Sequence, residues 1–247
     1  MAIVLFVFAH PDDETLGACV PIAEHVAAGH EVHVLWLTRG EASAVLNMLN
    51  GVTTSTWWGL LHRPVDEGYL PLDPITFASA RIAEATAAVR CLSSGLGTVG
   101  LHEGGLPDGG VTQAAAEAAI LATVAVIAPL GEPVRLKGHT WMPQLDNHPD
   151  HVAVGAAIKA LGTTDPVHFG DRRYYILPFY WADPDLTLVA EVWDSPAATD
   201  DIADRAINAI RCFGAWAPDR GSYAIGEHSV SSWFATLRAT PRSMVHK

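Results

Sequence analysis

The sequence predicts an α/β fold with a mostly parallel sheet, and two stretches of the chain carry this prediction. Residues 3–9 form an unbroken apolar run rich in β-branched and aromatic side chains, as expected of a strand buried on both faces. Residues 31–38 have the same character, and the intervening segment 16–28 reads as a helix. A strand, a helix and a second strand of these lengths make a βαβ unit, in which the two strands are parallel.

The alternation of strands and helices continues along the chain. Further core elements are predicted over 77–92, 98–101, 111–127, 133–138 and 152–161, the second and fourth of them as strands. Beyond Thr163 the pattern changes to two sheet-edge strands and two helices, over 173–177, 187–193, 200–213 and from Ser229 or Ser231 to 240. We therefore predict one domain over 1–247, with a core of 1–165 and a C-terminal extension, 166–247, packed on the same sheet.

Length and composition limit the class of protein. The 247 residues suffice for one α/β domain with a full core, and 49% hydrophobic against 17% charged residues indicate a globular chain. A formal net charge of −12 without any basic run argues against nucleic-acid binding. The N-terminal apolar run is too short for a signal segment, and no stretch approaches a membrane span of about 20 residues, so we expect a cytoplasmic protein. Three cysteines in apolar helical stretches are expected to be reduced core residues, namely Cys19, Cys91 and Cys212.

A polar turn follows the first strand and is the strongest functional signal in the chain. Pro11 cannot donate a ladder hydrogen bond, so the strand ends at His10, and Asp12, Asp13 and Glu14 lie between a strand end and a helix N-terminus. In open α/β sheets ligands bind at this position. Neighbouring carboxylates raise one another's pKa, and a bound cation removes that cost. Helix capping is the alternative role of these acids, but it explains neither His10 nor Pro11.

A metal ion accounts for the composition of this turn. His10 and Asp13, three residues apart, can place one nitrogen and one oxygen on the same ion, with Asp12 facing a bound water. The spacing alone does not decide which of the two aspartates binds the metal. A catalytic zinc site usually has three protein ligands and one open position, so a third ligand is expected elsewhere.

The best candidate for that ligand lies in a second polar turn, residues 146–151, with the sequence DNHPDH. Pro149 suits the first position of a helix, with Asn147 or His148 as its cap. His148 and His151, three residues apart at the helix start, can point into one site. Together the two turns predict a catalytic metal centre.

These motifs resemble those of the LmbE-like / PIG-L family of zinc-dependent N-acetylglucosaminyl deacetylases. Four separated motifs occur in the family's order: AHPDDE at 9–14, LTRGE at 37–41, R-x-x-E at 81–84 and HPDH at 148–151. The resemblance covers roughly residues 1–165. It implies a Rossmann-like three-layer α/β fold.

The resemblance also implies roles for residues of this chain. Three are implied zinc ligands: His10, Asp13 and His151. Two are implied catalytic groups, Asp12 as general base and a protonated His148 that stabilises the tetrahedral oxyanion. Glu14 and Asp150 are expected to support the site, Asp150 by hydrogen-bonding a histidine. Iron(II) is the alternative to zinc, because two histidines and one carboxylate suit both metals.

Residues that contact the substrate are expected on loops near this sheet edge. Arg39 and Glu41 follow the second strand, where Arg39 can clamp a hydroxyl or an anion; a surface ion pair with Glu41 is its alternative role. Trp57 and Trp58 lie in the irregular segment 45–74, and sugars pack against aromatic faces. A place in the hydrophobic core is the alternative for each tryptophan.

The glycine-rich loop 102–109 follows the third predicted strand. Asp108 in this loop is a further expected substrate contact, or a support for the first site. His102 and Glu103 invite interpretation as a second metal site, but no partner motif accompanies them. Arg81 and Glu84 lie on one face of the helix 77–92, where they can pair.

The predicted function is metal-dependent hydrolysis of the N-acetyl, or another N-acyl, group of an N-acetylglucosamine unit. A zinc-activated water would attack the amide, with Asp12 as general base. The substrate is expected to be a small-molecule glycoconjugate. The aromatic-rich segments favour a bulky one, such as a glycosylated natural product of the glycopeptide antibiotic type.

Three other functions are distinguishable from this one. An amidase acting on a sugar–thiol conjugate would differ only in the loops around the site. A non-catalytic, metal-dependent sugar-binding module would need neither Asp12 nor His148. A nucleotide-binding protein would need a G-x-G-x-x-G turn, which follows no strand of this chain. Neither a nucleic-acid nor a membrane partner is expected, and the sequence leaves the oligomeric state open.

Overall fold

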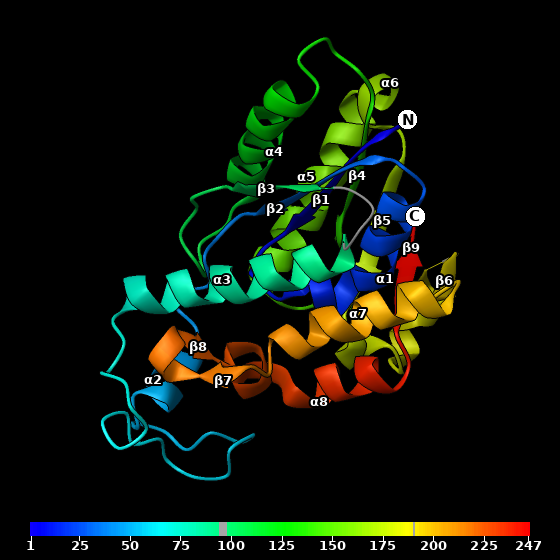
Figure 1. Cartoon of the computed structure of the whole chain (residues 1–247). Coiled ribbons are helices and arrows are strands. Elements are labelled where there is room, and N and C mark those ends of the chain that lie inside the picture. Colours follow the sequence, from blue (N-terminus) through cyan, green and yellow to red (C-terminus); the bar gives the residue numbers. More distant parts are fainter. Residues whose placement is uncertain (94–97, 190) are drawn as a thin grey trace.

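The computed structural model describes residues 1–93, 98–189 and 191–247 (Figure 1). Its centre is a seven-stranded sheet with the order β3-β2-β1-β4-β5-β9-β6. The first five strands in this order are mutually parallel, whereas β9 runs antiparallel to both of its neighbours. The strands are β1 (Ile3–Phe8), β2 (Glu31–Trp36), β3 (Val99–Glu103), β4 (Val134–His139), β5 (Arg172–Ile176), β6 (Val192–Pro196) and β9 (Arg242–His246). The predicted mostly parallel α/β fold is confirmed.

The helices and the small second sheet complete the molecule. The helices are α1 (Asp13–Ala27), α2 (Val45–Leu49), α3 (Pro74–Leu92), α4 (Gln113–Ile127), α5 (Pro149–Thr164), α6 (Pro166–Phe169), α7 (Asp200–Cys212) and α8 (Ile225–Ala239). The two-stranded sheet pairs β7 (Trp216–Ala217) with β8 (Ser222–Tyr223). In Figure 1 these two strands lie beside α2, at the end of the molecule where the irregular segment 50–73 projects. No helix in the described ranges is both long enough and apolar enough to cross a bilayer.

Helices cover both faces of the large sheet, so the fold has three layers. Alternate residues of β1 point to opposite faces, and both sets are fully buried. Phe6 and Phe8 pack against α1, α3, α7 and α8 on one face. Leu5 and Val7 pack against α4 and α5 on the other. This double burial is the physical reason for the unbroken apolar run in the sequence.

The winding of the chain changes direction at the centre of the sheet. The connections from β1 to β2 and from β2 to β3 pass over the face covered by α1 and α3, whereas those from β3 to β4 and from β4 to β5 use α4 and α5. A crevice therefore opens at the carboxyl ends of β1 and β4, where such sheets bind their ligands. Both polar turns of the sequence lie there.

The starts of α3 and α5 carry ordinary capping signals, whereas the start expected for the last helix was wrong: α8 begins at Ile225, ahead of the expected caps Ser229 and Ser231. The Asp73 carboxylate accepts a hydrogen bond from the Thr76 N–H (2.7 Å), and Pro74 occupies the first turn of α3. His148 caps α5, and Pro149 is its first residue, as predicted. The segment 45–74 contains the short helix α2 and otherwise turns and irregular backbone.

The C-terminal extension joins the sheet through three strands, and here two expectations were wrong. The strand expected over 187–193 begins only at Val192, because Pro184 starts a 3₁₀ turn whose first N–H groups are capped by Asp183. The strand expected at the sheet edge over 173–177, β5, instead lies inside the sheet, because a strand that the sequence pattern did not predict, β9, inserts between β5 and β6. Its sequence, RSMVH, lacks the apolar run of the central strands.

Candidate active site

Three donor atoms converge at the carboxyl ends of β1 and β4. His10 Nδ1 lies 3.2 Å from Asp13 Oδ2 and 3.1 Å from His151 Nε2, and the last two atoms are 3.4 Å apart. Ligand atoms about 2.1 Å from a tetrahedral ion are about 3.4 Å from one another. The three atoms therefore have the separations of three corners of a zinc-type site, and all three side chains are buried.

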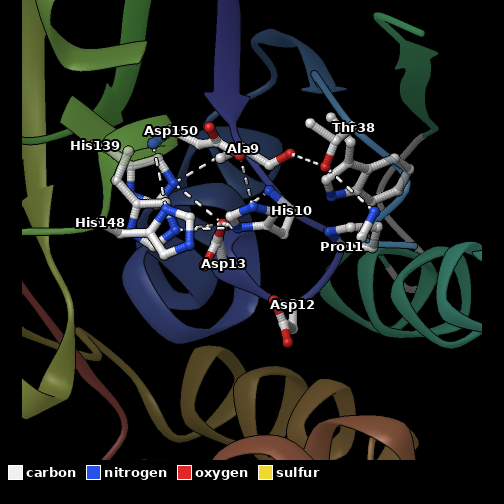
Figure 2. Close-up of polar contacts among 12 residues, drawn as sticks. Ala9, His10, Pro11, Asp12, Asp13, Thr38, His139, His148 and Asp150 are labelled. Atoms are coloured by element: carbon white, nitrogen blue, oxygen red, sulfur yellow. Dashed lines mark hydrogen bonds and ion pairs between the residues drawn. The ribbon is translucent and has the colours of Figure 1, made fainter. Parts of the chain in front are cut away.

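The local fold explains why these residues meet. His10 follows the end of β1, Pro11 turns the chain, and Asp13 is the first residue of α1. His151 lies in the first turn of α5, one helical turn after the cap His148. Figure 2 shows His10, Asp13, His139 and His148 gathered at one side of this turn, while the Asp12 side chain points away from them.

Carboxylates behind the histidines fix their tautomers. His10 Nε2 lies 3.1 Å from Asp108 Oδ1 and 3.3 Å from Asp150 Oδ2. His151 Nδ1 lies 2.8 Å from Asp146 Oδ2. Each carboxylate accepts the ring proton, which leaves a lone pair on His10 Nδ1 and His151 Nε2, the two atoms that face Asp13. This donor set fits a divalent metal ion.

The supporting carboxylates are themselves held by the backbone. Asp150 accepts hydrogen bonds from the N–H groups of Gly109 (2.8 Å) and Val111 (3.0 Å). Glu41 accepts one from the N–H of Asp108 (3.2 Å). Glu41, an expected substrate contact, therefore holds the loop that carries Asp108.

The charges of the cluster also favour a cation. Burial lowers the pKa of His151, but the carboxylates of Asp13 and Asp146 outweigh it and raise that pKa to about 9. Burial raises the pKa of Asp13, yet His151 and His139 hold it well below its usual range. Without a metal ion the cluster holds protons, which a divalent cation would displace.

Asp12 lies next to the donor set but outside it. Its backbone has a φ of 148°, in a region that favours glycine, and its carboxylate makes no capping hydrogen bond to α1. Residues held in such conformations cluster at functional sites. Its N–H donates to Glu14 Oε2 (3.0 Å), which helps to hold the turn. Burial, against the opposing charge of Arg81, raises the pKa of Asp12 to about 6.

Arg81 orients the Asp12 carboxylate. Its Nη2 lies 3.0 Å from Asp12 Oδ2, and its Nη1 donates to the carbonyl of Gly40 (2.9 Å). Gly40 has a φ of 68°, and a Cβ atom there would overlap the guanidinium, so only glycine fits. The expected pairing of Arg81 with Glu84 was wrong, because Glu84 instead accepts hydrogen bonds from the first N–H groups of α8.

Glu14 is fully buried beneath this turn. Its Oε2 accepts hydrogen bonds from Trp36 Nε1 (2.8 Å) and from the Asp12 N–H, and its Oε1 accepts one from the Thr15 hydroxyl (2.7 Å). Burial raises the pKa of Glu14 to about 7. Glu14 thus supports the backbone of Asp12.

His148 lies at the edge of the donor set. Its ring packs on that of His151 with 4.4 Å between centroids, and its Nδ1 accepts the Asp150 N–H (3.3 Å). The ring proton of a neutral His148 is therefore on Nε2. Burial and the positive charge of His151 lower the pKa of His148, which favours the neutral ring over the expected protonated one.

A cavity of about 320 Å³ opens over these groups. Its lining includes the site residues His10, Asp12, Asp13, Arg81, Asp108, His148 and His151. The opposite side comes from α8, where Ser229, Val230 and Trp233 line the cavity. The helical geometry of α8 breaks at Val230 (φ −144°), which brings this part of the C-terminal extension to the site.

Four expected substrate contacts lie outside this cavity lining, namely Glu41, whose role is described above, and Arg39, Trp57 and Trp58. Arg39 pairs with Glu103, with 2.9 Å between Nε and Oε2. Trp57 packs against His228 (4.9 Å between centroids), and Trp58 packs against Trp216 (5.0 Å). Within the described ranges, the cavity lining contains none of Arg39, Trp57 and Trp58.

The sequence did not predict a role for two residues of the site, Asp146 and His139. Asp146 was seen as part of a motif but given no role. His139 is the last residue of β4. Its ring stacks parallel to that of His151, with 3.9 Å between the ring centroids, and its Nε2 lies 3.2 Å from Asp13 Oδ2. Asp13, His139 and His151 could also hold a metal. However, the Ala9 N–H donates to His139 Nε2 (3.3 Å), so we assign His139 a positioning role.

The structure does not support the alternative of a second metal site at His102 and Glu103, which already lacked a partner motif in the sequence. His102 lies against His33, with 3.1 Å between ring nitrogens, and Glu103 pairs with Arg39. Among the described residues, every cluster with metal-ligand spacing belongs to the site at β1 and β4.

Fold and site together define an α/β protein with a metal-type donor set at the switch point of a doubly wound sheet. The chain belongs to the PIG-L family, described as GlcNAc-PI de-N-acetylase, whose pattern matches residues 5–161. Among its relatives is the 1D-myo-inositol 2-acetamido-2-deoxy-alpha-D-glucopyranoside deacetylase of Rhodococcus jostii. That protein is 31% identical over 195 residues, which are 72% of this chain and 60% of the relative. The chain thus spans less than two thirds of that relative's length.

Solved structures share the fold at lower identity. A deacetylase triple mutant of the teicoplanin biosynthetic pathway has a TM-score of 0.63 at 16% identity, covering 99% of this chain and 97% of that one. The 4-carboxy-2-hydroxymuconate hydratase of Pseudomonas putida has a TM-score of 0.57 at 16% identity, covering 100% and 95%. At such low sequence identity, the similarity shows only that the fold is shared. The hydratase demonstrates that this fold also occurs in proteins with other reactions.

Proposed function

We propose that this chain is a metal-dependent N-deacetylase that hydrolyses the N-acetyl group of an N-acetylglucosamine unit in a small-molecule glycoconjugate. The observation that carries the proposal is the arrangement of Asp12 beside the donor set. A buried carboxylate faces the cavity next to two histidines whose lone pairs are fixed toward one aspartate oxygen. A site that only bound a sugar would not need this extra carboxylate. The name of the relative described above supports the choice of reaction.

His10, Asp13 and His151 would hold a divalent ion, zinc or iron(II), which would acidify a water molecule and polarise the amide carbonyl. Asp12 would take the proton from the attacking water. A general base works best when its pKa is near the working pH, and burial already moves the pKa of Asp12 in that direction. Arg81, which the carbonyl of Gly40 holds in place, fixes the orientation of the Asp12 carboxylate in the cavity lining.

His148 would stabilise the negative charge that develops on the carbonyl oxygen. Its Nδ1 is occupied by the Asp150 N–H, so the neutral ring can donate from Nε2 without an additional proton. Such a hydrogen bond typically contributes roughly a hundredfold or more in rate. Asp12, then protonated, would return its proton to the leaving amine, and the products would be acetate and an amino sugar.

The substrate would enter between the strand ends and α8. Trp233 lines the cavity and offers an aromatic face to a sugar ring. Ser43 and Ser229 lie in the same lining and can hydrogen-bond sugar hydroxyls. These contacts come from both the core and the C-terminal extension, so the extension is part of the proposed substrate site.

Acetate release from free N-acetylglucosamine, its inositol conjugate and N-acetylglucosaminyl antibiotic scaffolds tests the proposal. We expect metal-dependent release from at least one conjugate. Asp12→Asn should keep the bound metal and lose about 100-fold or more in turnover, because the base is gone and the donor set is intact.

Matched variants distinguish a loss of catalysis from a loss of metal binding. His151→Ala should lose metal affinity, whereas His102→Ala, outside the donor set, should keep both metal and activity. Full activity of Asp12→Asn would refute the assignment of the base. Bound metal without acetate from any compound in the panel would refute the deacetylase proposal.

A further inference from the structure

Two half-buried thiols meet where α3 and α7 pack together. Cys91 is in the last turn of α3, and Cys212 is the last residue of α7. Their Sγ atoms are 3.7 Å apart, although the residues are 121 positions apart in the chain. The sulfurs of a disulfide are about 2 Å apart, so small side-chain rotations would bring these two into bonding distance.

The helix packing holds the two sulfurs at this separation. Ala85 and Ala88 of α3 and Ala206 and Ala209 of α7 are fully buried in the same hydrophobic cluster. Small side chains allow two helices to approach closely, and a close-packed core resists displacement. The thiols are therefore neighbours as a consequence of the fold.

Solvent reaches Cys91 through a surface hollow of about 420 Å³. Cys91 lines it together with polar residues of α7, including Asp201, Arg205 and Asn208. The hollow is polar and large enough for part of a small peptide-like disulfide. Cys19, by contrast, is a fully buried residue of α1.

We propose that Cys91 and Cys212 form an oxidative modification site that closes to an intramolecular disulfide by exchange with a small disulfide of the glutathione type. The thiolate of Cys91 attacks the oxidant, forms a mixed disulfide and releases one small thiol. The thiolate of Cys212 then attacks the Cys91 sulfur, forms the protein disulfide and releases the second small thiol. Two cysteine thiols lose two electrons and two protons, and the oxidant becomes two thiols.

The environment of Cys212 predicts how the rate of disulfide formation depends on pH. Burial and the neighbouring Cys91 raise the pKa of Cys212 to about 12, so little thiolate is present at neutral pH. Exchange proceeds through thiolates, so closure should be slow at pH 7 and faster as the pH rises. The closed bond would join two distant parts of the chain, which restricts the unfolded state and raises the melting temperature, by roughly 5 °C or more.

The positions of arginine in the sequence make the test specific. Arg90 and Arg211 immediately precede the two cysteines, so trypsin releases them on the peptides 91–135 and 212–220, and Cys19 on the separate peptide 1–39. The full chain is equilibrated at pH 8 with oxidised glutathione, blocked with iodoacetamide and digested without reductant. We expect the linked pair 91–135 / 212–220 in the mass spectrum, with peptide 1–39 not disulfide-linked.

Variants and melting curves complete the test. Cys91→Ala and Cys212→Ala should each abolish the linked pair and melt at the same temperature with and without oxidant. Cys19→Ala should still form it. Equilibrium mixtures that hold only glutathione adducts, with no linked pair, would overturn the proposal. A linked pair in the parent that leaves its melting temperature unchanged would overturn the predicted stabilisation.

Discussion

At the scale of single residues, the site depends on what lies behind each histidine. His151 faces Asp13 with Nε2 because Asp146 accepts the proton of Nδ1, and His10 faces it with Nδ1 because Asp108 and Asp150 surround Nε2. An isolated neutral imidazole can carry its proton on Nδ1 or on Nε2, and the buried carboxylates select one of these two tautomers. Carboxylates outside the proposed donor set therefore determine which ring nitrogens would be available to a metal ion.

Asp146→Ala tests this dependence. Removal of the carboxylate leaves His151 free to rotate and to place its proton on either nitrogen, so metal affinity should fall about 10- to 100-fold. Competition against a chelator of known affinity measures the change. Asp66→Ala, which removes an exposed carboxylate in the loop 50–73, serves as the matched control. Equal affinity in Asp146→Ala and the parent would contradict the argument.

Lys137, which lies away from the site, tests how a buried charge affects the free energy of unfolding. It is buried on β4 with its Nζ 3.4 Å from Asp171 Oδ1, and burial lowers its pKa to about 8. In the unfolded chain the pKa is about 10.4. Between these values the unfolded chain binds the proton and the folded chain does not, so the contribution of Lys137 to stability rises with pH there. Below pH 8 Lys137 is protonated in both the folded and the unfolded chain, so burial of its charge lowers the free energy of unfolding by the full amount.

Lys137→Met should therefore raise the free energy of unfolding at pH 7, by up to about 3 kcal/mol. The advantage of the variant over the parent should shrink between pH 8 and about 10.4. Asp171 keeps Arg135 and Arg173 as partners, so no isolated charge is created. Urea unfolding of both proteins at several pH values checks this, and a difference that is constant across the range would exclude the explanation.

At the scale of elements, α8 connects the extension to the site. Glu84 of α3 accepts hydrogen bonds from the N–H groups of Ile225 (3.0 Å) and Gly226 (3.4 Å), which fixes the start of α8. One turn later the helix breaks at Val230 and presents Trp233 to the cavity. The Glu84 carboxylate of α3 thus helps to position the side of the cavity that α8 supplies.

Glu84→Ala removes the acceptor of two buried N–H groups. We expect a loss of about 2–4 kcal/mol in the free energy of unfolding, because each unsatisfied group costs about 1–3 kcal/mol. KM for the substrate should rise with the displacement of Trp233. Denaturant titration and initial-rate kinetics measure the two effects, with Glu117→Ala on α4 as control. Unchanged stability would show that water replaces the carboxylate.

The sequence predicted those elements whose signals are local. The first H-P-D turn combines a strand end, a proline and a helix start within a few residues, and the second places a proline at a helix start, so their place in the fold could be inferred without tertiary information. The environment of Trp57 and Trp58 depends on His228 and Trp216, which are far away in the chain. His139 was recognisable only through the pairing of β4 with β1, and β9 only through partners on both sides.

At the scale of the whole molecule, the sheet depends on residues 242–246. β9 pairs with β5 and with β6, and His246 is fully buried with its Nε2 2.9 Å from Thr140 Oγ1. Thr140 follows His139 of the active site. The extension is thus continuous with the core through the sheet itself.

Truncation after Thr240 should abolish cooperative unfolding, because it removes an interior strand and leaves β6 without that neighbour. Lys247→Ala, which removes the exposed ion pair with Glu191 and the 5.9 Å contact of the ammonium with the Trp193 ring, should melt within about 1 °C of the parent. Circular dichroism melts of the two proteins compare these outcomes. A truncated chain that melts like the parent would show that β9 is dispensable.

The position of β9 also sets the order in which a growing chain can finish. During synthesis β1 to β5 emerge first and can pair, but the outer edge of β5 stays open until residues 242–246 leave the ribosome. An open strand edge is a template for pairing with other chains. In the interval between the emergence of β5 and that of β9, the nascent chain therefore exposes this strand edge to pairing with other chains.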